Sequence, residues 1–316
     1  MDFFFLFTKT YFCNILKETS TLVKRNQTYK KGKVKMIKKN AILLLLLVCL
    51  STIYANSKEL LVNIQDTKQW IGKVELVKEQ SNNNNPCFVL YGRYPTKLIY
   101  KNYIPIDSNK SYTFKARLRT LDEKLPASGY MGFQVLDKNK REITYQNVVV
   151  LPLEYSEVIS AKKGSNEVLI KLIPKFEKIK TQKLAFNAKE DQSDLPNFDL
   201  SSACKEVTKI DEKTIKVELA KPLTKDYAKG TKIRIHSKYS VPMYYLVSGW
   251  MPAGNGKECV ATLNGVANTS GAIKTQFWKG TKYARPFVWF GNWNRKPQAG
   301  AKLLVDKISL IEGNKK

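Results

Sequence analysis

The residues best suited to chemistry lie near the end of the chain, in the segment 282–290. Under the two-residue alternation of a β-strand, one face carries Tyr283, Arg285, Phe287 and Trp289. The other face carries Ala284, Pro286, Val288 and Phe290. Aromatic rings stack on sugar rings, and arginine and asparagine bind hydroxyls or carboxylates. This pattern predicts a ligand surface that Asn292 and Trp293 continue into a polar loop.

A second interpretation of these aromatic residues is structural. A sandwich strand must bury one face, so most of the aromatic side chains would then belong to the core, with a buried partner for Arg285. Trp293 follows Gly291 in a polar loop and is the least core-like of them. The predicted ligand-binding residues of this region are Tyr283, Arg285, Trp289, Asn292 and Trp293.

A cationic strand face is predicted in the segment 111–120. Tyr112, Phe114, Ala116 and Leu118 alternate there with polar residues that include Lys115, Arg117 and Arg119. Arg117 and Arg119 are predicted ligand-binding residues, as the opposite wall of a groove that faces the aromatic row. A solvated sheet face explains the same alternation.

An acidic loop suggests a further site. The loop 187–202 carries four acids, namely Glu190, Asp191, Asp194 and Asp199. They suit calcium or a glycosidase pair, but acidic loops are also simply solvated.

His236 is the single histidine of the chain, which excludes metal sites built from several histidines. We expect it to be a strand-end or core residue rather than a catalytic base, because no serine or cysteine motif accompanies it. Cys87, Cys204 and Cys259 follow the segment 1–55, and their spacing contains no CxxC element. The three cysteines can form one disulfide and leave one thiol, or they can remain as three buried thiols.

The elements that must position these residues are strands. Short runs rich in Val, Ile, Tyr and Phe alternate with Gly, Pro, Asn and Asp, which is typical of strands and turns. Strands are predicted at 111–120 and 129–136, with a turn at 137–140 leading into another strand at 143–150. The fold class is therefore all-β, a jelly-roll β-sandwich.

The middle of the chain differs from the rest in strand length and in tryptophan content. From about residue 164 to His236 the strands are compact and poor in tryptophan, whereas four of the five tryptophans follow residue 240. We therefore expect residues 56–160 and 240–316 to form the sandwich. Residues 161–239 then form an inserted small β subdomain.

The N-terminal segment has the layout of a secretory signal. Lys38 and Lys39 precede an apolar run at 41–50, and small residues end at Ala55. Residues 36–55 are the predicted signal peptide, and residues 1–35 are interpreted as a misassigned upstream extension. The alternative is a real extension of the chain that ends in a long positively charged region. Ten apolar residues are too few to span a bilayer, so no transmembrane segment is expected after cleavage. The expected location is secreted or periplasmic.

The net positive charge of the chain limits the classes of partner that it is expected to bind. The chain has a net charge of +27, and removing residues 1–55 leaves 44 basic and 25 acidic groups, a net of +19. Such a balance attracts polyanions. Export argues against nucleic acid and for acidic polysaccharide or a cell-surface glycan. Lysine-rich composition alone also explains the excess, because the lysines are scattered.

Two segments carry a resemblance to a known family. KSYTFKARLRT…GYMGFQVLDKNKREI and FWKGTKYARPFVWFGNWNRKPQAGAKLLVDKISLIE resemble the middle and closing strands of jelly-roll carbohydrate-binding modules with the galactose-binding-like fold. The resemblance covers about half of the chain after residue 55. It implies the fold and glycan binding. It also implies a structural calcium ion with Asp306, in the last predicted strand, as a candidate ligand, although one carboxylate is no coordination shell. The segment 164–236 resembles the small β-barrel modules of bacterial surface proteins.

These observations predict an exported, non-catalytic carbohydrate-binding protein, with acidic polysaccharide as one candidate ligand. The first alternative is a polysaccharide-active hydrolase or lyase on a β-sandwich. The second alternative is a structural protein of the cell envelope.

N-terminal sequencing of the exported protein tests the processing hypothesis. We expect the mature chain to begin at or near Asn56, because signal peptidase cleaves after small residues such as Ala55. Residues from the segment 1–35 on the mature chain would contradict a misassigned start.

Overall fold

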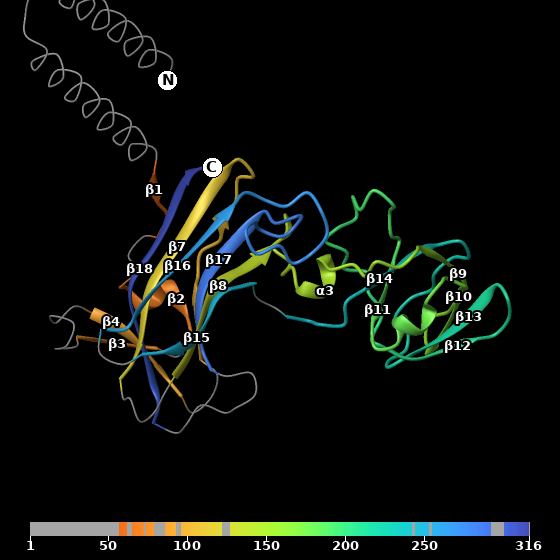
Figure 1. Ribbon diagram of the computed structural model, residues 1–316, viewed down its shortest axis with the longest axis horizontal. Coiled ribbons are helices and arrows are strands. Elements are labelled where there is room, and N and C mark those ends of the chain that lie inside the picture. Colours follow the sequence, from red (N-terminus) through yellow and green to blue (C-terminus); the bar gives the residue numbers. More distant parts are fainter. Residues whose placement is uncertain are drawn as a thin grey trace, which may run out of the picture. The chain divides into compact units, whose positions relative to one another are not determined.

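The computed structural model describes residues 57–61, 65–72, 74–78, 86–92, 96–121, 127–241, 244–252, 255–291 and 300–315. They are organised in three antiparallel sheets of six strands each (Figure 1). Within these ranges no helix has the length and apolar composition needed to cross a membrane.

Sheet A is the first sheet of the sandwich, with the order β16-β7-β18-β4-β3 and with β1 paired to β18. Its strands are β1 (Lys58–Glu59), β3 (Glu75–Lys78), β4 (Pro86–Tyr91), β7 (Lys110–Thr120), β16 (Lys257–Asn264) and β18 (Lys302–Asn314). Sheet B has the order β15-β8-β17-β5-β2, with β6 paired to β17. Its strands are β2 (Trp70–Ile71), β5 (Thr96–Tyr100), β6 (Ile104–Pro105), β8 (Ala127–Leu136), β15 (Tyr244–Met251) and β17 (Tyr283–Phe290).

The strand order is that of a jelly roll. The eight main strands in chain order are β4, β5, β7, β8, β15, β16, β17 and β18. Sheet A then contains the sixth, third, eighth and first of them, and sheet B the fifth, fourth, seventh and second. Successive strands thus alternate between the two sheets except for β8 and β15, which are neighbours in sheet B, as in a double Greek key. Strands after residue 244 share both sheets with strands before residue 136.

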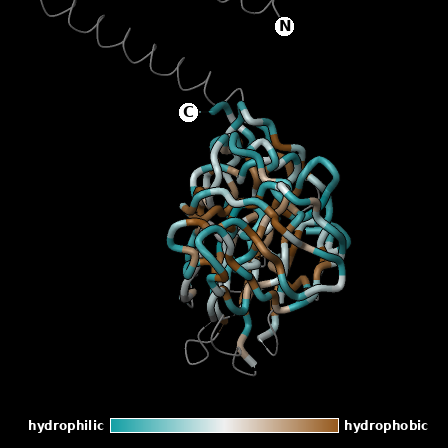
Figure 2. Tube along the Cα trace, turned by 90° about the vertical axis from the view of Figure 1, so that its right-hand side faces the viewer, coloured by the Kyte–Doolittle hydropathy of each residue, from teal (hydrophilic) through white to brown (hydrophobic). Residues whose placement is uncertain are grey.

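The sandwich core lies between the inner faces of sheets A and B. Phe114, Phe133 and Phe277 are fully buried, and Phe133 contacts both other rings. On β7 the predicted core residues Tyr112, Phe114, Ala116 and Leu118 all point into this core. Figure 2 shows hydrophobic and hydrophilic stretches interspersed along the chain trace. The all-β sandwich prediction is confirmed.

The third sheet is built from the middle of the chain, in the order β11-β14-β9-β10-β13-β12. Its strands are β9 (Ser156–Ala161), β10 (Glu167–Lys171), β11 (Lys183–Phe186), β12 (Cys204–Lys209), β13 (Thr214–Leu219) and β14 (Lys232–His236). It has its own core, which includes Val168, Ile170, Val217 and Ile233. The sheet begins at Ser156, ahead of the boundary expected at residue 161. The described residues also contain two short 3₁₀ turns, η1 (Thr67–Gln69) and η3 (Phe176–Ile179), and the short helix α3.

The predicted strand at 143–150 is wrong. This segment contains the short helix α3 (Tyr145–Val148), which lies between β8 and β9 along the chain. Asn147 explains it, because its Oδ1 accepts hydrogen bonds from the Thr144 N–H at 2.8 Å and from the Thr144 hydroxyl at 2.5 Å and so caps the start of the helix. The apolar residues of the segment had the composition of a strand, but the local hydrogen bonds favoured one helical turn.

No disulfide links the cysteines Cys87, Cys204 and Cys259, which are all buried. Burial raises the pKa of the Cys204 thiol to about 12. These side chains therefore behave as small apolar groups.

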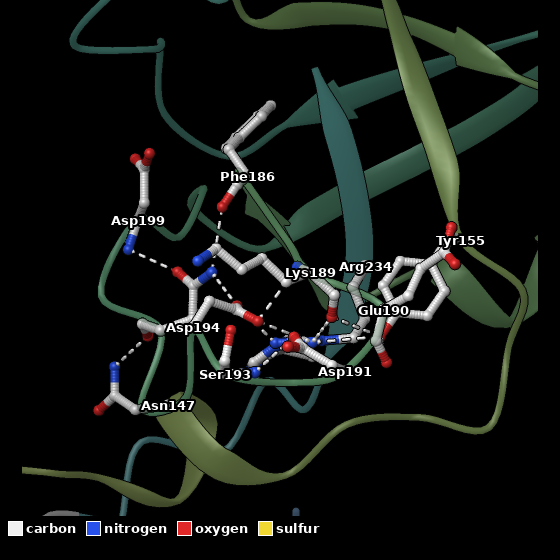
Figure 3. A network of polar contacts seen from close by, with 12 residues as sticks. Asn147, Tyr155, Phe186, Lys189, Glu190, Asp191, Ser193, Asp194, Asp199 and Arg234 are labelled. Carbon is white, nitrogen blue, oxygen red and sulfur yellow. Dashed lines mark hydrogen bonds and ion pairs between the residues drawn. The ribbon is translucent and has the colours of Figure 1, made fainter. Parts of the chain in front are cut away.

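A buried polar network holds the loop 187–202 against the third sheet (Figure 3). Its centre is Arg234 on β14, whose side chain is 1% exposed. Arg234 donates hydrogen bonds from Nη2 to Asp194 Oδ2 at 2.8 Å, and from Nη1 to Asp194 Oδ1 and to the Lys189 carbonyl, both at 3.2 Å. Tyr155 accepts a further hydrogen bond from Nη1 at 3.3 Å. Since a buried charge needs such partners, the loop and the strand must form together.

His236 completes the network. Arg234 Nε donates to His236 Nε2 at 3.1 Å, so the imidazole is neutral and carries its proton on Nδ1, which donates to the Gln146 carbonyl at 2.7 Å. Burial lowers the pKa of His236 to about 4, and the charge of Arg234 acts in the same direction. Burial also acts on Asp194, but hydrogen bonds from Asn197, Lys189 and Arg234 outweigh it and hold the pKa of Asp194 below its usual value. His236 is therefore a structural histidine here.

This network predicts a loss of stability at mildly acidic pH. The unfolded chain takes up a proton at His236 near pH 6.5, whereas the folded protein takes it up only near pH 4. The folded state therefore loses roughly 3 kcal/mol relative to the unfolded state as the pH falls through this window, and no penalty exists above it. Urea unfolding between pH 7 and pH 4 measures the change.

His236→Gln is the matched variant, because it removes the single histidine titration of the chain. We expect a flatter stability profile between pH 6.5 and pH 4, whatever the absolute stability of the variant at pH 7. An NMR titration of the imidazole with a midpoint near its ordinary value would show that the histidine is not buried as described.

Candidate functional site

The outer face of sheet B carries the best candidate site, and β17 determines it. Ala284, Val288 and Phe290 point into the sandwich core. By strand alternation, Tyr283, Arg285, Phe287 and Trp289 point to the opposite face, away from sheet A. The predicted division of this strand into two faces therefore holds.

One end of the outer face is packed. Phe287 is fully buried and Trp289 is 7% exposed, in a small cluster with Ile99. Tyr130 lies opposite Trp289 on β8, with ring centroids 5.1 Å apart and an interplanar angle of 33°. Lys97 Nζ lies 5.7 Å from the centre of the Trp289 ring. Trp289 thus offers little open surface for stacking on a sugar.

The other end of the outer face is accessible, and it gathers aromatic and charged groups. Tyr103 is 38% exposed, and its ring lies edge-on to Tyr283 at 6.3 Å. The Arg285 guanidinium lies 5.0 Å from the centre of the Tyr103 ring, and Lys140 Nζ lies 4.7 Å from it. We call this set the tyrosine–arginine cluster; its members are Tyr103, Gln134, Lys140, Glu142, Tyr283 and Arg285.

A chain of side-chain hydrogen bonds joins the polar members of the cluster. Arg285 donates from Nε to Gln134 Oε1 at 2.8 Å, and its Nη2 donates to the same oxygen. Gln134 Nε2 donates to Glu142 Oε1 at 3.0 Å. Gln134 is therefore locked with its oxygen toward Arg285 and its nitrogen toward Glu142.

Strand pairing brings these residues together from four places in the chain. Arg285 lies directly opposite Gln134 in the pairing of β17 with β8. Tyr283 pairs with Pro105 of β6. Tyr103 directly precedes β6 and therefore lies beside β17. Glu142 returns to Leu136 through an isolated bridge.

The turn after β8 positions Lys140. Asp137 accepts backbone hydrogen bonds from Asn139 and Arg141, each at 2.8 Å, and a third from the Arg141 side chain. These bonds hold Lys140 at φ 60°, a left-handed conformation that a non-glycine residue adopts only when its surroundings impose it. The predicted turn at 137–140 thus fixes the backbone position from which the Lys140 side chain reaches the cluster.

Glu142 is electrostatically perturbed. Burial raises the pKa of its carboxyl above the usual value, although the hydrogen bond from Gln134 and the charges of Lys97 and Arg285 act against this change. The charges that act on Glu142 are thus cationic. That surrounding favours a binding surface over a general acid paired with a second carboxylate.

Arg117 and Arg119 lie elsewhere. They belong to the outer face of sheet A, because the alternate residues of β7 fill the core. Arg119 is buried, with 4% exposure. The proposed groove with Arg117 and Arg119 facing the aromatic row therefore cannot form, since the two sets lie on opposite outer faces of the sandwich. Which sheet each strand joins was not readable from its own alternation.

Asp306 forms an ion pair with Arg117. The two residues are opposite each other on β18 and β7, and the guanidinium donates to both carboxylate oxygens, Nε to Oδ1 at 2.7 Å and Nη2 to Oδ2 at 2.6 Å. This donor set does not suit calcium, because the cation position at the carboxylate is already taken by the guanidinium. Among the described residues, no group of three or more His, Cys, Asp or Glu side chains could hold a metal.

Two of the four acids of the loop 187–202 also have cationic partners. Asp194 pairs with Arg234, as described above. Asp199 accepts hydrogen bonds from Tyr227 at 2.6 Å, from Lys225 at 2.9 Å and from Asn187 at 2.8 Å. These contacts give both carboxylates a structural role in the third sheet.

Asn292 and Trp293 lie outside the described residues, so their predicted role stays a prediction. Sequence reasoning missed four members of the cluster: Tyr103, Gln134, Lys140 and Glu142. Gln134 alone carried a detectable signal, as a polar residue on the outward side of a predicted strand, opposite Met131, Phe133 and Val135.

Comparisons with known proteins leave the family open. The chain matches no protein-family model, and a search of curated proteins found no significant match. The case for a function therefore depends on the fold and on the geometry of the tyrosine–arginine cluster.

Proposed function

We propose that this protein is a non-catalytic glycan-binding protein, secreted or periplasmic, that holds a polysaccharide or cell-surface glycan on the outer face of sheet B. The observation that carries the proposal is the tyrosine–arginine cluster. It combines an exposed ring at Tyr103 with hydrogen-bond donors at Arg285 and Lys140. A ring for stacking and donors for hydroxyls are the two requirements of sugar recognition.

The jelly-roll fold supports the proposal as a scaffold. A sheet face is rigid, and cross-strand pairs such as Arg285 with Gln134 hold side chains in fixed positions. The resemblance to galactose-binding-like carbohydrate-binding modules agrees with this use of the fold. Fold alone does not determine function, so the proposal depends on the cluster.

A structural envelope protein is the second candidate, and one observation favours it. Phe287 and Trp289 are packed rather than open, so the aromatic row is partly a core feature. If the whole face serves packing, removing the exposed ring of Tyr103 should leave glycan affinity unchanged.

Tyr103→Ala tests the proposal. Loss of the ring should weaken glycan binding by about 1–3 kcal/mol, by analogy with the stacking of bases on aromatic side chains. Fold stability should hardly change, because Tyr103 is 38% exposed. Calorimetry against a panel of glycans measures the affinity, and thermal melting measures the stability.

Tyr91→Ala is the matched control. Tyr91 is 41% exposed on sheet A, and Lys302 Nζ lies 5.4 Å from its ring centre, much as Lys140 lies over Tyr103. We expect the control to bind as the parent protein does. Equal affinities of all three proteins, or a Tyr103→Ala variant that melts far below the parent, would contradict the site.

A further inference from the structure

The environment of Arg285 differs from that of two other arginines of the protein. Arg117 pairs with Asp306 and Arg234 pairs with Asp194, in both cases through hydrogen bonds to both carboxylate oxygens. Arg285 instead directs Nε and Nη2 to the neutral amide of Gln134. No ion pair joins it to an acid in the part of the chain that the structure describes. Its guanidinium is held in place, and no described acidic residue pairs with it directly.

The geometry of the guanidinium determines which of its donors stay available. The group is planar and has five N–H bonds, and Gln134 takes the two on the Nε–Nη2 side. One N–H of Nη1 and the second N–H of Nη2 then run side by side at the end of the group. That pair matches the spacing of two oxygens of one anion.

Two contacts hold this end in position. Gln134 fixes the guanidinium in its plane, and Gln134 is itself held by Glu142. The Tyr103 ring lies 5.0 Å from the guanidinium carbon. A donor pair that is ordered before binding loses less entropy when an anion arrives.

A second cation accompanies Arg285. Lys140 Nζ lies 4.7 Å from the Tyr103 ring centre and 5.9 Å from that of Tyr283. The cluster thus has two cations around its tyrosines. Its acid, Glu142, accepts a hydrogen bond from Gln134, and Arg285 acts on it through its charge without a hydrogen bond between them. The accessible end of the cluster is therefore a positive surface with aromatic rings.

We infer that Arg285 binds the carboxylate or sulfate group of an acidic sugar unit, while Lys140, at the same Tyr103 ring, adds positive charge and Tyr103 contacts the sugar ring. This inference rests on the proposed glycan-binding function and adds the class of ligand to it. Single-stranded nucleic acid also combines rings with anions. The signal-peptide pattern at residues 36–55 favours an extracytoplasmic glycan instead.

Binding to two matched pairs of polymers tests the inference. Polygalacturonate and its methyl ester differ in the carboxylate alone, and dextran sulfate and dextran differ in the sulfate. We expect the full chain to bind at least one charged polymer about tenfold or more tighter than its neutral partner, as a charge-assisted hydrogen bond pair provides. The charged member that binds identifies the anion.

Arg285→Gln should abolish the preference for the charged polymer. Arg285→Lys keeps the charge but loses the paired donors, so it should retain only part of the preference. Lys115→Gln removes one cation from the outer face of sheet A and should leave the preference unchanged. If Arg285→Gln lowers the melting temperature, Lys140→Gln replaces it, because Lys140 lies in a turn and makes no core contact that its loss would expose.

Each other outcome is informative. Equal binding of charged and neutral polymers, still dependent on Tyr103, would overturn the inference and leave the proposed function in place. An anion preference that survives Arg285→Gln would also overturn the inference. Binding of poly(dT) as tight as that of the charged glycans would assign the surface to nucleic acid. Failure of all four polymers to bind would contradict both proposals.

Discussion

Strand β17 must place one face against the sandwich core, and the rest of the candidate site depends on this constraint. It lies between β8 and β5 in sheet B, so neither of its edges is open to solvent along the paired residues. Val288 and Phe290 fill the core, and the two-residue repeat then forces Arg285 outward. A shift of one residue in the pairing would bury Arg285 in the core, where an arginine without a carboxylate is costly. The same pairing places Gln134 opposite Arg285. The register of β17 against β8 therefore determines the geometry of the site.

Three arginines show how the partner decides the role of a charge in this protein. Arg234 is enclosed by Asp194, His236 and the Lys189 carbonyl, so it stabilises the third sheet. Arg117 is neutralised by Asp306 across two strands, which satisfies both groups at the surface of sheet A. Arg285 is held by the neutral amide of Gln134, and no described carboxylate pairs with its charge. Buried or half-buried ion pairs mainly fix geometry, whereas an ordered cation without a carboxylate is available to a ligand.

The all-β class, the sandwich and the two faces of β7 and β17 could be predicted, because burial imposes a two-residue alternation on each strand. The pairing of distant strands could not be predicted in the same way. Arg117 and Arg285 look alike in their own strands, but one faces outward from sheet A and the other from sheet B. Tyr103 and Lys140 had no local signal, since they reach the site through the pairing of β6 with β17 and through the turn that Asp137 holds. At 143–150, the capping residues Thr144 and Asn147 outweighed the strand-like composition.

The central claim is that an acidic glycan lies on the outer face of sheet B with its anion at Arg285. A crystal structure of the protein with an acidic oligosaccharide tests this most directly. The account predicts an anionic group about 2.7–2.9 Å from the terminal nitrogens of Arg285 and a sugar ring in contact with Tyr103. A ligand bound to the outer face of sheet A or to the third sheet, with Arg285 and Tyr103 untouched, would contradict it.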